Sequence, residues 1–103
     1  MAITVLTDTN FKDVITKSEI PVLVDFYADW CKPCMRLVPT LEEIAEEKNG
    51  EILVCKVDVD ESQGIAGAYQ VMSIPNIIVF KNGEVHKRLT GAVSKEELLE
   101  LVE

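Results

Sequence analysis

Short apolar runs alternate with longer amphipathic stretches over the first two thirds of the chain. The apolar runs have the length of β-strands and cover residues 3–6, 22–27 and 52–58. The stretches after them carry apolar residues at helical spacing, so we expect helices around residues 11–15, 34–48 and 62–69. Because parallel neighbouring strands require crossover connections, this alternation predicts parallel strands covered by helices.

Local signals mark the ends of the first two helices. Asp8 is expected to cap the first helix, and Asn49-Gly50 is expected to end the second. Pro39 lies inside the second helix and predicts a kink there, because proline removes one backbone donor and crowds the preceding turn.

The last third of the chain has the pattern of a hairpin. Two β-rich runs, residues 77–80 and 85–90, are separated only by Lys81-Asn82-Gly83-Glu84. Asn-Gly between such runs indicates an antiparallel pair of strands. The second run contains His86-Lys87-Arg88 and suits an edge strand, since charge there discourages pairing with other molecules.

A final helix is predicted after Ser94, which forms the pattern of a capping box with Glu97. Leu98, Leu101 and Val102 share one face of this helix. Taken together, the elements predict an α/β protein in which one mixed sheet lies between layers of helices.

Size and charge narrow the class of protein. We expect the 103 residues, of which 48 % are hydrophobic, to form one domain (1–103) that buries a core without disulfide staples. The net charge of −8 argues against nucleic acid as a partner. The sequence has neither a signal-peptide pattern nor an apolar run near the roughly 18 residues of a transmembrane helix. We therefore expect a cytoplasmic protein that does not act at membranes.

Two of the three cysteines lie in the run Trp30-Cys31-Lys32-Pro33-Cys34, where the second strand passes into the second helix. Residues three apart on a helix are neighbours, so the two sulfurs can bond without unwinding the backbone. Free backbone N–H groups and the positive end of the helix dipole favour a thiolate at this place. The pair is therefore a candidate dithiol/disulfide couple.

The positions of the two cysteines suit two different roles in thiol–disulfide exchange. The reaction needs one thiolate to attack a substrate disulfide and a second thiol to resolve the mixed disulfide. Cys31 lies at the helix start beside Trp30 and suits the attack, whereas Cys34 is one turn further in and suits the resolving step. Pro33 is tolerated because first-turn N–H groups lack helical partners, and its fixed φ holds the geometry of the pair.

Further residues accompany the pair: Asp25 in the second strand, Lys56 in the third, Ile74-Pro75 before the fourth and Gly91 after the fifth. With the Trp-Cys-x-Pro-Cys run and the order of elements, they resemble the thioredoxin family over essentially the whole chain. The resemblance implies the thioredoxin fold, a three-layer α/β/α sandwich with a five-stranded mixed central sheet and four helices. It also implies a protein-disulfide reductase that serves cell redox homeostasis and electron transport to target enzymes.

Asp25 interrupts an apolar strand, and burying a carboxylate is costly unless it is paired, hydrogen-bonded or protonated. Lys56 interrupts the neighbouring strand, from which it could reach Asp25. The resemblance implies that Asp25 lies beneath the cysteines and, with Lys56, helps to take the proton from Cys34 during the resolving step. A structural ion pair between the two side chains is the alternative.

The resemblance also implies a substrate groove. It supplies a cis peptide bond before Pro75 and an extended substrate that pairs with the backbone at Ile74. Such strand addition depends more on backbone than on side chains and so permits many protein substrates. Trp30, Val59, Ile74 and Gly91 match the apolar rim of the groove, and ordinary core packing is the alternative, above all for Val59.

Lys32 stands where thioredoxins usually have glycine. A cation beside Cys31 stabilises its thiolate and hence the reduced form, which makes the disulfide more oxidising. Lys32 and Pro33, the two residues between the cysteines, are therefore the candidates for tuning the redox potential.

Cys55 and His86 are not expected to take part in the chemistry. Cys55 is interpreted as a small core hydrophobe, with a redox role as the alternative. His86 is interpreted as a surface residue. They are the only other soft ligands and do not form a second paired motif, which argues against a zinc site. We expect no metal and no organic cofactor.

The expected partners are disulfide-containing target proteins and a thioredoxin reductase of unknown type, and the expected state is a monomer. Two other functions stay open at this point. One is an oxidase or isomerase activity, as in the related disulfide-isomerase domains. The other is a non-catalytic binding module that shares the thioredoxin fold.

Overall fold

The computed structural model describes residues 3–103. Within these residues the chain forms, in order, β1 (Thr4–Leu6), α1 (Phe11–Lys17), β2 (Val22–Tyr27), α2 (Lys32–Glu47), β3 (Leu53–Asp58), α3 (Gln63–Ala68), β4 (Asn76–Lys81), β5 (Glu84–Thr90) and α4 (Lys95–Leu101). The order and the type of the elements predicted from the apolar and polar pattern are confirmed.

The strands form one mixed sheet in the order β1-β3-β2-β4-β5. β1 and β2 both pair with β3 in parallel, and β4 pairs antiparallel with β2 and with β5. Asn82 and Gly83 both have positive φ, which the tight turn of a two-residue hairpin requires. The hairpin is confirmed, as is the edge position of its second strand, β5.

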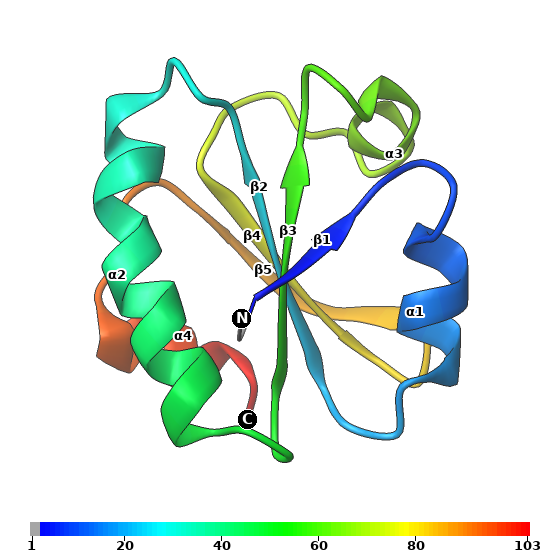
Figure 1. Ribbon diagram of the computed structural model, residues 1–103, viewed down its shortest axis with the longest axis vertical. Coiled ribbons are helices and arrows are strands. Elements are labelled where there is room, and N and C mark those ends of the chain that lie inside the picture. The colour runs from blue at the N-terminus through cyan, green and yellow to red at the C-terminus, as the bar shows by residue number, and fades with distance from the viewer. Residues whose placement is uncertain (1–2) are drawn as a thin grey trace.

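The helices cover both faces of the sheet. α1 and α3 lie on one face and α2 and α4 on the other, so the three-layer sandwich is confirmed (Figure 1). Along β2, Val24 belongs to the apolar cluster shared with α1, whereas Leu23 belongs to the cluster shared with α2 and α4. Because both faces of β2 are buried, its sequence is a nearly continuous apolar run.

Asp8 caps a different helix from the one that the sequence predicts. The residue at the N-cap of α1 is Asn10, and its side chain makes no capping hydrogen bond. The Asp8 carboxylate instead accepts hydrogen bonds from the backbone N–H of Ile65, at 2.9 Å, and of Gly64, at 3.3 Å, in the first turn of α3. The prediction was wrong because the fold brings a second helix start, with free N–H groups, next to this carboxylate.

Three other local predictions concern the proline inside α2, the end of α2 and the start of α4. α2 runs without interruption through Pro39 from Lys32 to Glu47, and the kink expected at Pro39 stays a prediction. The chain leaves α2 at Lys48, and Gly50 follows with φ +88°. The capping box of α4 is formed by Ser94 and Glu97 in both directions.

None of the helices found between Ile3 and Glu103 is long and apolar enough to cross a membrane.

Candidate redox site at the start of α2

The end of β2 and the start of α2 place the two cysteines of the Trp-Cys-x-Pro-Cys run. After β2 the chain turns once, with the N–H of Cys31 donating to the carbonyl of Ala28 at 3.1 Å. Cys31 is the N-cap residue of α2, Pro33 lies in the first turn, and Cys34 is the third helical residue. Proline is accepted there because its missing N–H would have no helical partner.

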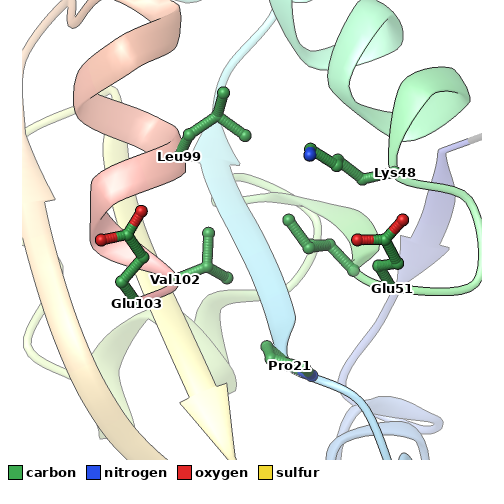
Figure 2. Close-up of a pocket in the computed structure, with 7 residues that line it drawn as sticks. Pro21, Lys48, Glu51, Leu99, Val102 and Glu103 are labelled. Atoms are coloured by element: carbon green, nitrogen blue, oxygen red, sulfur yellow. The ribbon is translucent and has the colours of Figure 1, made fainter.

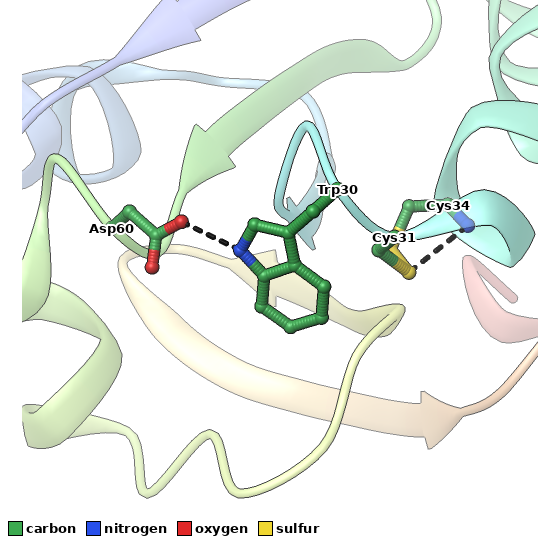
Figure 3. The surroundings of a disulfide bond; sticks show 4 residues. All are labelled: Trp30, Cys31, Cys34 and Asp60. Carbon is green, nitrogen blue, oxygen red and sulfur yellow. Dashed lines mark hydrogen bonds between the residues drawn. A yellow bond between two sulfur atoms is a disulfide. The ribbon is translucent and has the colours of Figure 1, made fainter.

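Cys31 and Cys34 form a disulfide with a Cα–Cα distance of 5.2 Å (Figure 3). The backbone N–H of Cys34 donates a hydrogen bond to Sγ of Cys31 at 3.2 Å. The sulfur of Cys31 thus takes the place that a serine or aspartate oxygen takes at other helix N-termini. An N–H donor and the positive end of a 16-residue helix both favour negative charge on this sulfur after reduction.

The two sulfurs differ in exposure, though by a small margin. Cys34 is fully buried and Cys31 is 5 % exposed, in a small cluster with Ala28 against which Val59 and Ile74 pack. Trp30, immediately before the pair, is 70 % exposed. The more accessible sulfur is therefore that of Cys31, reached beside an exposed aromatic ring.

Asp60 holds the ring of Trp30 and was missed by the sequence analysis. The indole N–H of Trp30 donates to Oδ2 of Asp60 at 2.9 Å (Figure 3). Asp60 is itself fixed by Asp58, whose Oδ1 accepts from the backbone N–H of Asp60 at 2.9 Å. Two aspartates spaced by one residue at the end of a strand are a recognisable turn signal, but the contact across 30 residues is not visible in the sequence.

Asp25 lies in β2 on the face covered by α2, next to the cysteine site. It is only 2 % exposed, and its Oδ1 has no hydrogen-bond partner. Burial raises the pKa of this carboxyl group to about 7, and the positive charge of Lys56 opposes the rise. A carboxyl group with this pKa gains and loses a proton near neutral pH.

Lys56 lies opposite Asp25 in the pairing of β2 with β3, as the sequence predicts. Both residues line a cavity of about 430 Å³ with Tyr27 and Met35. The ammonium group of Lys56 lies 5.4 Å from the centre of the Tyr27 ring. The close ion pairs found among residues 3–103 both involve Lys95, so Asp25 and Lys56 interact across the cavity rather than as a contact ion pair.

The groove beside the disulfide is formed by the segment that leads into β4. The Ile74–Pro75 peptide bond is cis, as expected. A hollow of about 200 Å³ is lined by Trp30, Val59, Val71, Met72, Ser73 and Ile74. Gly91 has φ +98° and donates its N–H to the carbonyl of Pro75 at 2.8 Å, which places it next to the same segment. Met72 is 91 % exposed at this hollow, and the sequence analysis did not single it out.

Comparison with known proteins gives one family. A sequence model of the Thioredoxin family matches residues 2–103. The chain is 42 % identical over 97 residues to a thioredoxin of Rickettsia felis, which covers 94 % of this chain and 92 % of that protein. It is 41 % identical over 93 residues to a thioredoxin of Pseudomonas aeruginosa, with 90 % and 86 % covered.

The chain belongs to the thioredoxin family.

Membership of the thioredoxin family and the closed cysteine pair together define the activity. The protein is a protein-disulfide reductase that works by dithiol–disulfide exchange. The chain is also 43 % identical over 98 residues to the M-type chloroplastic thioredoxin of Spinacia oleracea, which covers 95 % of this chain. It spans about half of that relative, 54 % of its length.

Two residues outside the thioredoxin-family site agree with the interpretation given to them. Cys55 is buried within β3 in the apolar cluster on the α1 side, and burial raises the pKa of its thiol to about 12. His86 is exposed on β5, and desolvation together with Lys81 and Lys87 lowers the pKa of its imidazole. Among residues 3–103 no group of three potential metal ligands comes together.

A third hollow, of about 310 Å³, lies at the opposite end of the sheet, where β2 and β3 begin (Figure 2). It is lined by Pro21, Lys48, Glu51, Ile52, Leu99, Val102 and Glu103. It contains none of the residues that the thioredoxin-family motif carries, so the redox chemistry belongs to the other end of the molecule.

Proposed function

We propose that Cys31 attacks a protein disulfide and Cys34 resolves the mixed disulfide that results. The observation that carries this assignment is the hydrogen bond from the Cys34 N–H to Sγ of Cys31 at the start of α2. This donor stabilises charge on Cys31 and not on Cys34. The slight exposure of Cys31 and the complete burial of Cys34 support the same order of events.

The first step is an exchange of one sulfur–sulfur bond for another. The Cys31 thiolate forms a bond to one sulfur of the substrate disulfide, and the other substrate sulfur leaves as a thiolate and takes up a proton from solvent. In the second step Cys34 loses its proton and attacks Sγ of Cys31. The Cys31–Cys34 disulfide forms and the bond between Cys31 and the substrate sulfur breaks. The second substrate sulfur leaves as a thiolate and takes up a proton from solvent, so that two electrons have passed to the substrate.

Asp25 is proposed to receive the proton of Cys34, directly or through water. Its pKa of about 7 supports this role, since a base acts best when its pKa lies near the working pH. The cavity that Asp25 shares with Lys56 offers a route for the proton to solvent. Lys56 supports the charged form of Asp25 by its positive charge, and without it the carboxyl group would hold its proton more tightly.

Protein substrates are proposed to bind as an added strand along Ile74. In the described part of the chain, neither the N–H nor the carbonyl of Ile74 has a backbone partner, so both are free for a substrate. Trp30 and Val59 would contact the side chains of the substrate, with Pro75 and Gly91 bounding the groove next to the sulfurs. Lys32 and Pro33 are proposed to tune the redox potential of the pair.

We place this activity in the cytoplasm, in a monomer whose residues 1–103 form a single domain. A thioredoxin reductase would return two electrons to the Cys31–Cys34 disulfide, and disulfide-containing enzymes would receive them, so that the protein serves electron transport and redox homeostasis. The two sulfurs carry the electrons, and no cofactor or metal is assigned to the exchange.

Reduction of insulin by the protein with dithiothreitol as electron source tests the assignment. Cys31→Ser is expected to lose the activity, whereas Cys55→Ser, the matched control, is expected to keep it. Cys34→Ser is expected to accumulate a mixed disulfide with insulin, because the attack proceeds and the resolving thiol is missing. Insulin reduction by a folded Cys31→Ser protein at the normal rate would contradict the proposal.

A further inference from the structure

The segment between α3 and β4, residues 70–75, carries the groove but is held by few backbone contacts. At its start the N–H of Val71 donates to Ala66 at 2.9 Å, and at its end the carbonyl of Pro75 accepts from Gly91 at 2.8 Å. Between these points, Met72, Ser73 and Ile74 have no backbone partner among the described residues. The position of the segment therefore depends on what fixes its two ends.

One side chain of the edge strand reaches both ends. Arg88 lies in β5 opposite Ile78. Its Nη1 donates to the carbonyl of Tyr69 at 2.9 Å, and its Nη2 donates to Oδ1 of Asn76 at 3.4 Å. Tyr69 is the last residue before the segment and the C-cap of α3, and Asn76 is the first residue of β4.

The end at Tyr69 is weak without such a contact. α3 has six residues, two of which are Gly64 and Gly67, and glycine destabilises a helix interior. The carbonyl groups of the last turn of a helix have no partner within the helix. Arg88 supplies a charged donor to one of them, and at a helix C-terminus a cation is also favoured by the dipole.

The end at Asn76 is firm by comparison. Asn76 is buried and paired in the sheet with Phe26 on one side and Thr90 on the other. The guanidinium group is planar and rigid, so its two N–H donors keep a fixed spacing. A single arginine thus links the end of the segment at Tyr69, which has few contacts, to the end at Asn76, which is fixed in the sheet.

We propose that Arg88 is a positioning residue for protein substrates. Its two hydrogen bonds hold residues 70–75 at the geometry in which the backbone of Ile74 pairs with an extended substrate. The inference rests on the proposed strand addition at Ile74 and adds the side chain that fixes the position of the substrate-binding segment. It predicts an effect on the binding of protein disulfides and no effect on the sulfur chemistry.

The test compares a protein substrate with a small one. The protein is first reduced and then mixed with increasing insulin, and its oxidation is followed by the fluorescence of Trp30, the only tryptophan of the chain. With Arg88→Ala we expect the insulin concentration at half-maximal rate to rise about three- to tenfold, which is the size of the net contribution of one exposed hydrogen bond, with the maximal rate unchanged. The rate with hydroxyethyl disulfide, which is small and uncharged, should not change.

Two further variants separate the effect of the two hydrogen bonds of Arg88 from the effect of its positive charge. Lys87→Ala removes one positive charge from the neighbouring position of β5, and it should leave both substrates unaffected. Arg88→Lys keeps the charge without the two-pronged donor, and it should recover less than half of the lost affinity. Complete recovery in Arg88→Lys, or an equal effect in Lys87→Ala, would show that charge alone acts.

Other outcomes also overturn the inference. An unchanged dependence on insulin in Arg88→Ala excludes the positioning role, and an equal loss with insulin and hydroxyethyl disulfide indicates general damage to the fold. Failure of the proposed function gives a different result, because the unmodified protein would then reduce insulin no faster than Cys31→Ser does.

Discussion

The start of α2 and the middle of β3 place cysteines in opposite chemical environments. Cys31 caps a helix, its sulfur accepts an N–H donor, and an exposed tryptophan lies beside it. Cys55 lies among apolar side chains in the sheet, where burial raises the pKa of its thiol to about 12. Both residues are buried by area, so exposure does not separate them. The difference lies in the groups that meet the sulfur.

Asp25 is a second buried group, and it differs from Cys55 in its ordinary pKa. Burial raises the pKa of Asp25 as it raises that of Cys55. The rise is similar in the two residues, from 3.8 to about 7 for Asp25 and from 9.0 to about 12 for Cys55, although Asp25 also lines a cavity and faces the charge of Lys56. The same burial leaves a thiol protonated and inert at neutral pH, whereas it brings a carboxyl group to a pKa at which it can act as a base there.

The largest contrast is expected in alkylation of the reduced protein. At about pH 7 a thiol with a pKa near 12 is ionised in about one molecule in 10⁵, so Cys55 should hardly react with iodoacetamide. Cys31 should react faster than Cys55 by a factor on the order of 10³ or more. Mass spectrometry after timed quenching measures both rates. Comparable rates in the folded protein would remove the contrast, and unfolding in guanidinium chloride provides the control in which all three cysteines react.

The next largest effect concerns Asp25. Its pKa is about 7 in the folded protein against an ordinary value of 3.8, so the folded state binds this proton more tightly than the unfolded state. The wild-type protein therefore loses stability as the pH rises from about 4 to about 7, and the full loss is present above that range. Asp25→Asn should be more stable by on the order of 4 kcal/mol at about pH 8 and nearly equal at about pH 4.

Urea unfolding of the oxidised proteins at several pH values measures this difference. The same variant should reduce insulin more slowly near neutral pH, because Cys34 has lost its base. Two stability curves that run parallel between these pH values would show that Asp25 is not held protonated. An unchanged turnover would contradict its catalytic role.

A smaller effect is expected from truncation at Cys55. Cys55→Ala removes a buried sulfur from a packed cluster and should lower the free energy of unfolding by about 1 kcal/mol. Insulin reduction should stay at the wild-type rate, because the thiol takes no part in the exchange. Thermal or urea unfolding with a parallel activity assay measures both quantities. Loss of activity in the folded variant would give Cys55 a redox role.

The smallest effect is expected from Lys32→Gly, since Lys32 is exposed and its charge is screened by salt. Removing this cation should destabilise the Cys31 thiolate slightly and lower the reduction potential by about 10–20 mV. Equilibration of both proteins with glutathione at low salt measures the shift. A potential that is equal or higher in the variant would mean that Lys32 does not tune the pair.

Most of the fold could be predicted because its signals are local. The alternation of apolar runs and helical spacing gave the elements, Asn82-Gly83 gave the hairpin, and Ser94 with Glu97 gave the start of α4. The capping role of Asp8 was assigned to the wrong helix, because its partner, α3, begins more than 50 residues later. A local capping signal fails to identify its helix wherever the fold brings the start of another helix next to the capping side chain.

The site could be predicted in part for the same reason. Cys31 and Cys34 are three residues apart, and helical geometry alone brings their sulfurs together. The contact of Trp30 with Asp60 and the contacts of Arg88 with Tyr69 and Asn76 join distant segments, and neither was anticipated. Met72 was also missed, since an apolar residue in a sequence carries no mark of its exposure.

The sequence by itself determined which residues are paired along one helix turn, which runs become strands, and which family the chain resembles, because each depends on spacing within a few residues. Only the tertiary structure decided how far the pKa of a buried ionisable group moves from its ordinary value. Burial and the opposing charge of Lys56 set the pKa of Asp25, and both follow from the packing of β2, β3 and α2. Electrostatic free energies depend on surroundings in space, which no local pattern contains.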